Sequence, residues 1–296
     1  MQSAVANTGC RHRQTASRLA ALLVDALKQT ERTSTMRLPI TLIGAALLAV
    51  LAISAIAATS AMAAPVERGL CKAAKKGLGE YTDSQCLTPG LKGGAKKEFV
   101  WVPVAKAQAF TTTSGEATLK SFTPEGAELP AVTCSKSKGK GKVLTATTTE
   151  LVVTFEGCIS AGEKCTGGVK AKAGQIVTKT LDGVLGTIGG GTGAGEAVGG
   201  EGGGVSAEFK CGANEVQVEG AAIGELTPVN VKASTTATEA FNATGSTQEF
   251  ETLEGVHHNL QTEINGLGAG TFPFRSVLIG RLAIKMSSSL ILRVFA

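Results

Sequence analysis

Alternating apolar and polar residues dominate the chain after residue 64. The alternation occurs in short stretches, rich in Val and Thr and bounded by Gly, Pro or Ser, such as EFVWVPV at 98–104 and NEVQVEG at 214–220. A period of two predicts β-strands with one buried face, and no stretch carries the period of a helix of about twelve residues. We therefore predict an all-β fold, an antiparallel sandwich or barrel of many short strands, held by disulfides and preceded by a signal-peptide helix.

The N-terminal region has a different pattern. Arg37 is followed by an apolar run from Ile40 to Ala58 and then by small residues in the order A-M-A. A basic start, an apolar segment and such small residues are typical of a secretory signal peptide, here residues 36–63, with cleavage between Ala63 and Ala64. The alternative is that Ile40 to Ala58 stays uncut and anchors the protein in the cell membrane, because about 20 apolar residues span a bilayer.

Residues 1–35 precede the methionine of this signal. We interpret them as an upstream start-site artefact or a disordered extension. The rest of the chain divides into a disulfide-tied N-terminal segment at 64–94, a β domain at 95–265 and a tail at 266–296. The tail is apolar and basic and of doubtful status, and two runs in it could form a hairpin around 287–289.

The exported part contains an even number of cysteines: Cys71, Cys86, Cys134, Cys158, Cys165 and Cys211. An oxidising compartment makes disulfides the expected state, and the C-x-x-C spacing of zinc or redox sites is absent. We predict the pairs Cys71–Cys86 and Cys158–Cys165 from their spacing, and Cys134–Cys211 by elimination.

Ten glycines lie in the tract IGGGTGAGEAVGGEGGGVS at 188–206. Because glycine loses the most conformational entropy on ordering, we predict a mobile loop between two strands. The spacing of glycines matches no phosphate-binding loop.

Several short segments follow one another in a fixed order along the chain: YTDSQC, FVWVP, TSGEATL, VTCSKSKGKGKV, VVTFEGC, GEKCTGG, GQIVTKTLDGVLG, FKCG and IGELTPVN. Together they resemble a recurrent group of uncharacterised secreted proteins of soil actinobacteria with six cysteines and a β-rich sequence. The resemblance covers roughly residues 71–260. The group has no assigned activity, so the resemblance implies secretion and disulfides but assigns no functional residue. Its members usually begin near this Met36 and usually end in polar residues.

Few residues suggest chemistry. Glu80, Tyr81 and Asp83 form the best acidic cluster for a glycan site, but a turn in which Asp83 accepts backbone hydrogen bonds is favoured, since aromatic residues make up only 4% of the chain. The adjacent His257 and His258 would point to opposite faces of a strand and make a poor metal site. We expect no metal or cofactor.

Lysines recur at every second position in SKSKGKGK: Lys136, Lys138, Lys140 and Lys142. On a strand they form one basic face, which could contact a cell-wall or other anionic polymer. Nucleic acid is not expected, because removing residues 1–63 takes away six of 29 basic and two of 24 acidic residues and leaves a net charge near +1.

The sequence therefore favours a secreted, non-catalytic extracellular or cell-surface module whose ligand is unknown. One alternative is a secreted hydrolase with a Glu-based, glycan-active site. The other is a membrane-tethered surface protein that keeps its signal helix.

Overall fold

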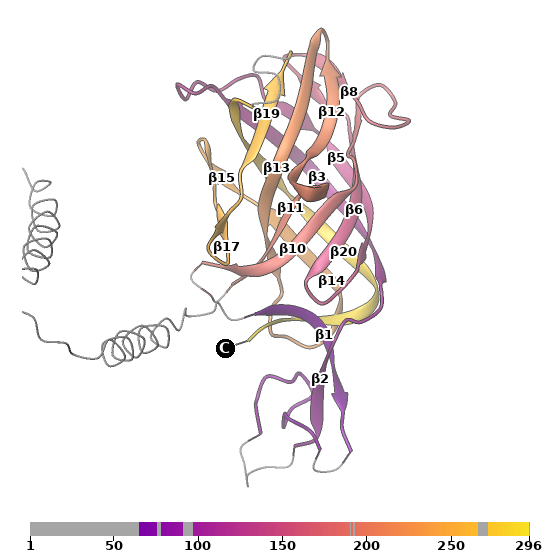
Figure 1. Cartoon of the computed structure of the whole chain (residues 1–296). Helices are drawn as coiled ribbons and strands as arrows, with labels where there is room; N and C mark the ends of the chain where they lie inside the picture. The colour runs from indigo at the N-terminus through magenta and orange to yellow at the C-terminus, as the bar shows by residue number, and fades with distance from the viewer. Residues whose placement is uncertain are drawn as a thin grey trace, which may run out of the picture. The chain divides into compact units, whose positions relative to one another are not determined.

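The computed structural model describes residues 65–75, 78–90, 97–189, 191, 193–265 and 272–295 (Figure 1). Strands dominate these ranges, and their only helical element is the short turn η1 (Glu201–Gly203). The all-β prediction is confirmed there. In the same ranges no helix is long and apolar enough to cross a membrane. The predicted signal peptide, its cleavage site at Ala63 and Ala64, and residues 1–35 lie outside the described residues.

Eight strands pair antiparallel, each with the next along the chain, and the last pairs with the first. They are β3 (Gln108–Phe122), β5 (Lys136–Val143), β6 (Thr148–Glu156), β10 (Leu181–Ile188), β11 (Gly193–Gly200), β13 (Asn214–Thr227), β14 (Ser234–Phe241) and β20 (Phe274–Val294). The sheet is therefore closed, as in the barrel alternative of the prediction.

Shorter strands extend this ring. The strands β4 (Val132–Cys134), β7 (Ile159–Ser160), β8 (Glu163–Thr166), β12 (Val205–Cys211) and β19 (Leu260–Ile264) complete a second closed path through β3, β13 and β20. β9 (Gln175–Val177) pairs with β6, and β1 (Val66–Ala73) joins β20 to β2 (Phe99–Pro103). Two small hairpins are formed by β15 (Ala243–Thr244) with β16 (Thr247–Gln248) and by β17 (Thr252–Leu253) with β18 (Val256–His257).

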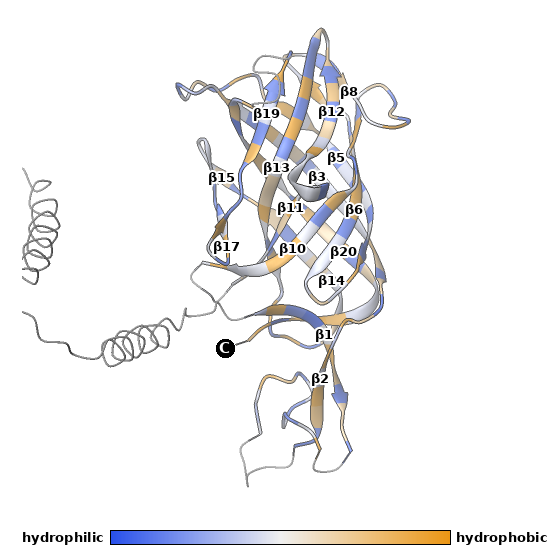
Figure 2. Cartoon of the chain, viewed as in Figure 1, coloured by the Kyte–Doolittle hydropathy of each residue, from blue (hydrophilic) through white to orange (hydrophobic). Residues whose placement is uncertain are grey.

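Alternation of side chains explains how the closed sheet buries a core. Figure 2 shows apolar and polar positions alternating along β13, and successive residues of a strand point to opposite faces. One core cluster includes Phe110, Leu151 and Leu185, which come from β3, β6 and β10. A second surrounds Phe209 of β12 and contains four cysteines.

Three disulfides are present, but only one of the three predicted pairs is correct. Cys71 bonds Cys86 as predicted, whereas Cys134 bonds Cys158 and Cys165 bonds Cys211. The prediction of a Cys158–Cys165 pair was wrong because it weighed closeness in sequence. In the sheet, Cys165 lies directly opposite Cys211 in the pairing of β8 with β12. Three disulfides are typical of proteins in an oxidising compartment.

The disulfide between Cys134 and Cys158 closes a loop with a sequence separation of 24 residues. In the chain-entropy account, losing a crosslink of this length costs about 3 kcal/mol. Replacing both cysteines by serine is therefore expected to lower the free energy of unfolding by about 3 kcal/mol in urea denaturation. Peptide mapping without reduction should recover Cys134–Cys158 and Cys165–Cys211 peptides, and a Cys158–Cys165 peptide would contradict the pairing.

The glycine-rich tract is not the predicted loop. Its described residues form the end of β10, all of β11, η1 and the start of β12. The glycines permit close strand contacts: a Cβ on Gly199 would lie 2.3 Å from the backbone oxygen of Gly220 on β13. Close packing against neighbouring strands therefore determines the conformation of this segment, and the flexibility of glycine does not.

The predicted tail of doubtful status is part of the sheet. Residues 274–294 form β20, a single strand of 21 residues, instead of a hairpin around 287–289. β20 pairs with β1, β3, β14 and β19, and Val277 in it is fully buried. The charges of the tail did not prevent this, because Arg275, Arg281 and Lys285 occupy exposed positions of the strand and the buried Arg293 contacts aromatic rings.

Candidate functional site: a polar cluster and a cavity inside the closed sheet

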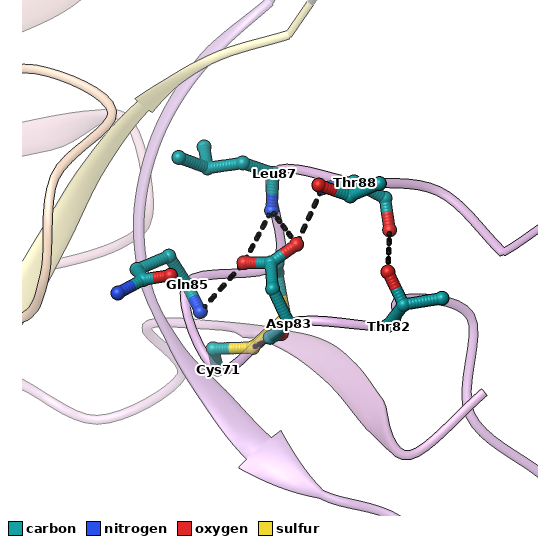
Figure 3. Close-up of a disulfide and its surroundings, with 7 residues drawn as sticks. Cys71, Thr82, Asp83, Gln85, Leu87 and Thr88 are labelled. Atoms are coloured by element: carbon teal, nitrogen blue, oxygen red, sulfur yellow. Dashed lines mark hydrogen bonds between the residues drawn. A yellow bond between two sulfur atoms is a disulfide. The ribbon is translucent and has the colours of Figure 1, made fainter. Parts of the chain in front are cut away.

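The acidic cluster predicted near the first disulfide is a turn. Asp83 accepts hydrogen bonds from the backbone N–H groups of Gln85, Leu87 and Thr88 at 2.6–3.2 Å, beside Cys71 and its disulfide (Figure 3). Burial raises the pKa of Asp83, but these hydrogen bonds outweigh it and hold the pKa below its usual value. The structural interpretation of Asp83 is confirmed, and the carboxylate is committed to the backbone.

The aromatic residues of this region contact a buried arginine. The Arg293 guanidinium lies 4.5 Å from the ring centre of Tyr81 and 5.5 Å from that of Trp101, and Phe295 completes the cluster. Trp101 also donates a hydrogen bond of 2.7 Å to Glu67. These contacts join the N-terminal segment to the end of β20, and each ring is in contact with the Arg293 guanidinium.

The four predicted lysines form one exposed face of β5, as expected. Three of them are in ion pairs with strand β6: Lys136 and Lys138 with Glu156, and Lys142 with Glu150. These glutamates neutralise part of the basic face. Contact with an anionic polymer stays a prediction.

His257 lies exposed on β18, and burial lowers the pKa of the partly buried His258 below its usual value. Among the residues that the structure describes, no group of three or more His, Cys, Asp or Glu side chains is placed to hold a metal ion.

A charged cluster that the sequence did not reveal lies inside the ring. Arg68 of β1 forms an ion pair of 2.7 Å with Glu196 of β11, and Glu196 also accepts a hydrogen bond of 2.5 Å from the Thr149 hydroxyl of β6. Glu239 of β14 is close enough to interact electrostatically with both charged groups. All four residues are buried, with no more than 7% of the surface of each exposed. Charged groups are almost never buried to this degree unless paired.

Two glycines make room for the carboxylates. A Cβ on Gly183 would lie 2.3 Å from Oε1 of Glu196, and one on Gly224 would lie 2.5 Å from Cγ of Glu239. Gly224 is also the strand partner of Glu196 in the pairing of β11 with β13. The sheet therefore has space for these side chains only because its inner face lacks a side chain at these two positions.

Burial is the main reason that the pKa of Glu239 lies well above its usual value. The nearby Glu196 carboxylate raises the pKa further, and Arg68 only partly opposes these effects. Glu239 is thus held in its neutral form at pH values where an exposed glutamate is ionised.

This raised pKa predicts a pH dependence of stability. The folded state binds a proton that the unfolded state releases above the reference pKa of 4.5, so stability is full below that pH and falls as the pH rises through the folded-state pKa. Glu239→Gln cannot ionise and is expected to flatten this decline in urea denaturation between about pH 5 and 9.

The exposed Glu208, which pairs with Lys179 on the surface, provides a control. Glu208→Gln should retain the wild-type slope of stability against pH. A Glu239→Gln protein with an unchanged slope would contradict the buried neutral carboxyl.

Two adjoining cavities occupy the interior. The larger, about 130 Å³, is lined mainly by apolar side chains, among them Leu119, Phe155, Phe209 and Val218. The smaller, about 40 Å³, is lined by the charged cluster and by Thr112 of β3. Leu151 and Val198 line both cavities, so the two are neighbours. Since about 10–15 Å³ suffices for one water molecule, the larger cavity has room for a small apolar molecule.

Three side chains that line the smaller cavity each contain a buried polar atom without a hydrogen-bond partner: Arg68 Nη1, the Thr112 hydroxyl and Glu239 Oε1. Nearly all buried polar groups in proteins are satisfied, so three such side chains around one cavity mark it as a candidate site for a bound molecule. The cavity also reaches the exposed residues Val231 and Lys232 in the loop between β13 and β14, which gives a route from solvent.

Comparisons of the chain with protein-family models, with curated proteins and with solved structures find no match. The site must therefore be interpreted from its own geometry. Glu196 lies within the glycine-rich tract and Arg68 next to the predicted cleavage site, and neither position carries a motif. One sequence feature could have revealed the cluster. In STTATEAF, the charged Glu239 takes a position that the period of two places on the same face as the apolar Ala237 and Phe241.

Proposed function

We propose that this protein is an exported, non-catalytic binding module that holds a small, mostly apolar molecule inside its closed sheet. The observation that carries the proposal is the apolar cavity of about 130 Å³ that adjoins buried polar atoms without partners. Largely apolar, preformed cavities with a few polar groups are typical of small-molecule sites.

The export part of the proposal is supported by the three disulfides and by the signal pattern at 36–63. An intact mass of the cell-free product, with and without reduction, tests it. We expect a chain that begins at Ala64 and contains three disulfides. A product in the membrane fraction that keeps Ile40 to Ala58 would instead support the tethered alternative.

The hydrolase alternative is not favoured. The acidic pair that lines the smaller cavity, Glu196 and Glu239, is buried, and the Glu196 carboxylate is already held in an ion pair with Arg68. Tyr81 and Trp101, the rings expected beside a glycan, contact Arg293 instead.

Binding can be tested with the neutral fluorophore N-phenyl-1-naphthylamine, whose emission rises in apolar surroundings. We expect saturable binding to the disulfide-intact protein. Ala222→Leu, which adds bulk to the wall of the larger cavity, should weaken this binding, whereas Ala127→Leu in an exposed turn should not. A cooperative thermal unfolding transition is the check that each variant is folded. If Ala222→Leu does not fold, Val198→Phe takes its place as the variant of the cavity wall. Absence of saturable binding by the folded wild type would overturn the proposal.

A further inference from the structure

The unpartnered polar atoms of side chains that line the smaller cavity also indicate which polar group a ligand would need. Arg68 Nη1 and the Thr112 hydroxyl are hydrogen-bond donors, and both residues are more than nine-tenths buried. Glu239 lines the same cavity, and its Oε1 has no hydrogen-bond partner. Glu196 is already held by Arg68 Nη2 and Thr149, so it does not compete for these donors.

We infer that the ligand is an apolar chain that ends in a carboxylate, and that Arg68, Thr112 and Glu239 hold this carboxylate while the chain lies in the larger cavity. This inference rests on the proposed function and specifies its ligand class.

The donors explain the choice of a carboxylate. A carboxylate has two oxygens that accept several hydrogen bonds, so it can satisfy the guanidinium and the hydroxyl together. Because Glu239 is held in its neutral form, it can donate a third hydrogen bond and does not repel the ligand. An alcohol oxygen accepts at most two hydrogen bonds, fewer than the three donors of the guanidinium, the hydroxyl and the neutral carboxyl, and an ammonium group has no acceptor at all.

The charges around the site agree with this choice. Arg68 and Glu196 neutralise one another, Glu239 is neutral, and the exposed Lys232 at the solvent-facing side of the cavity adds a positive charge. A carboxylate therefore meets no net negative charge in the cluster. A doubly charged phosphate would have to share a cavity of only about 40 Å³ with the Glu196 carboxylate.

The larger cavity sets the shape of the apolar part. It continues from Leu151 and Val198 to Phe209, Val218 and Leu260, which are apolar residues contributed by strands of both closed paths. An unbranched chain of medium length fits such a space, and decanoate is a suitable probe.

The test compares three ligands that share one chain and differ only in the polar end. Decanoate, decanol and decylamine each compete with N-phenyl-1-naphthylamine for the full, disulfide-intact protein. We expect decanoate to displace the fluorophore at a concentration at least about ten-fold lower than decanol, since a hydrogen bond to a charged group contributes this much or more. Decylamine should be the weakest of the three.

Thr112→Val removes the hydroxyl with little change of volume and is expected to weaken decanoate about ten-fold while leaving decanol unchanged. Thr111→Val, at the neighbouring exposed position of β3, is the matched control and should change neither ligand. Arg68 is unsuitable as the primary variant because its loss is expected to destabilise the fold.

The outcomes separate the two proposals. If the fluorophore binds but decanol displaces it as well as decanoate does, the carboxylate inference is overturned and the proposed function stands. If decanoate is preferred but Thr112→Val leaves its affinity unchanged, the assignment of the carboxylate to this cluster is overturned. If neither fluorophore nor any chain binds, the cavities contain water only and both proposals fall.

Discussion

Replacing Arg68 by methionine is expected to lower the free energy of unfolding by about 3–5 kcal/mol, measured by urea denaturation at neutral pH. The methionine fills much of the arginine's volume, so the loss arises from the Glu196 carboxylate, which would stay buried without a charged partner. The cost of burying an unpaired charge is larger than the net stabilisation provided by the ion pair itself.

Two comparisons isolate this effect. Arg275→Met removes an arginine whose ion pair with Glu251 is largely exposed, and should cost less than about 1 kcal/mol. Adding Glu196→Gln to Arg68→Met removes the unpaired charge and should restore part of the lost stability. If the single and double variants were equally unstable, the loss would come from packing alone.

Removing the C-terminal residues 272–296 is expected to abolish folding altogether. β20 provides the buried side chains Val277, Ile284 and Leu290, and the burial of each contributes about 1.5–3 kcal/mol. These contributions approach the total stability of an ordinary domain, about 5–15 kcal/mol. The truncation would also open the ring between β3 and β14 and expose two unpaired strand edges.

Far-UV circular dichroism and resistance to proteolysis measure this loss. The matched test is to add back a synthetic peptide of residues 272–296, which should restore the protease-resistant form. A truncated chain that unfolds cooperatively without the peptide would contradict the central position of β20.

In β20 the local pattern of the sequence and the long-range pairing of the structure can be told apart. Alternation with a period of two is a local property, so it correctly predicted strands along most of the described chain. The same alternation is present in β20, but its length of 21 residues arises from pairing with four different strands in succession. Pairing partners far apart in the sequence leave no local signal.

The prediction of a mobile loop for the glycine-rich tract was wrong for a related reason. Composition favours a flexible loop, whereas the structure uses these residues where neighbouring backbones approach closely or where Glu196 needs space. The disulfides behave in the same way: the even count of cysteines after residue 64 predicts disulfides, but the partner of Cys165 is decided by the pairing of β8 with β12.

The sequence by itself determined that the chain is β-rich, that the six cysteines after residue 64 form disulfides and that Asp83 belongs to a turn. These features depend on side-chain period, residue type and contacts a few residues apart. Only the tertiary structure decided that the sheet closes and that Arg68, Glu196 and Glu239 meet inside it with Thr112 and an apolar cavity. Those residues come from five strands, β1, β3, β6, β11 and β14, once Thr149 is included, and closure of the ring is what buries their charges together.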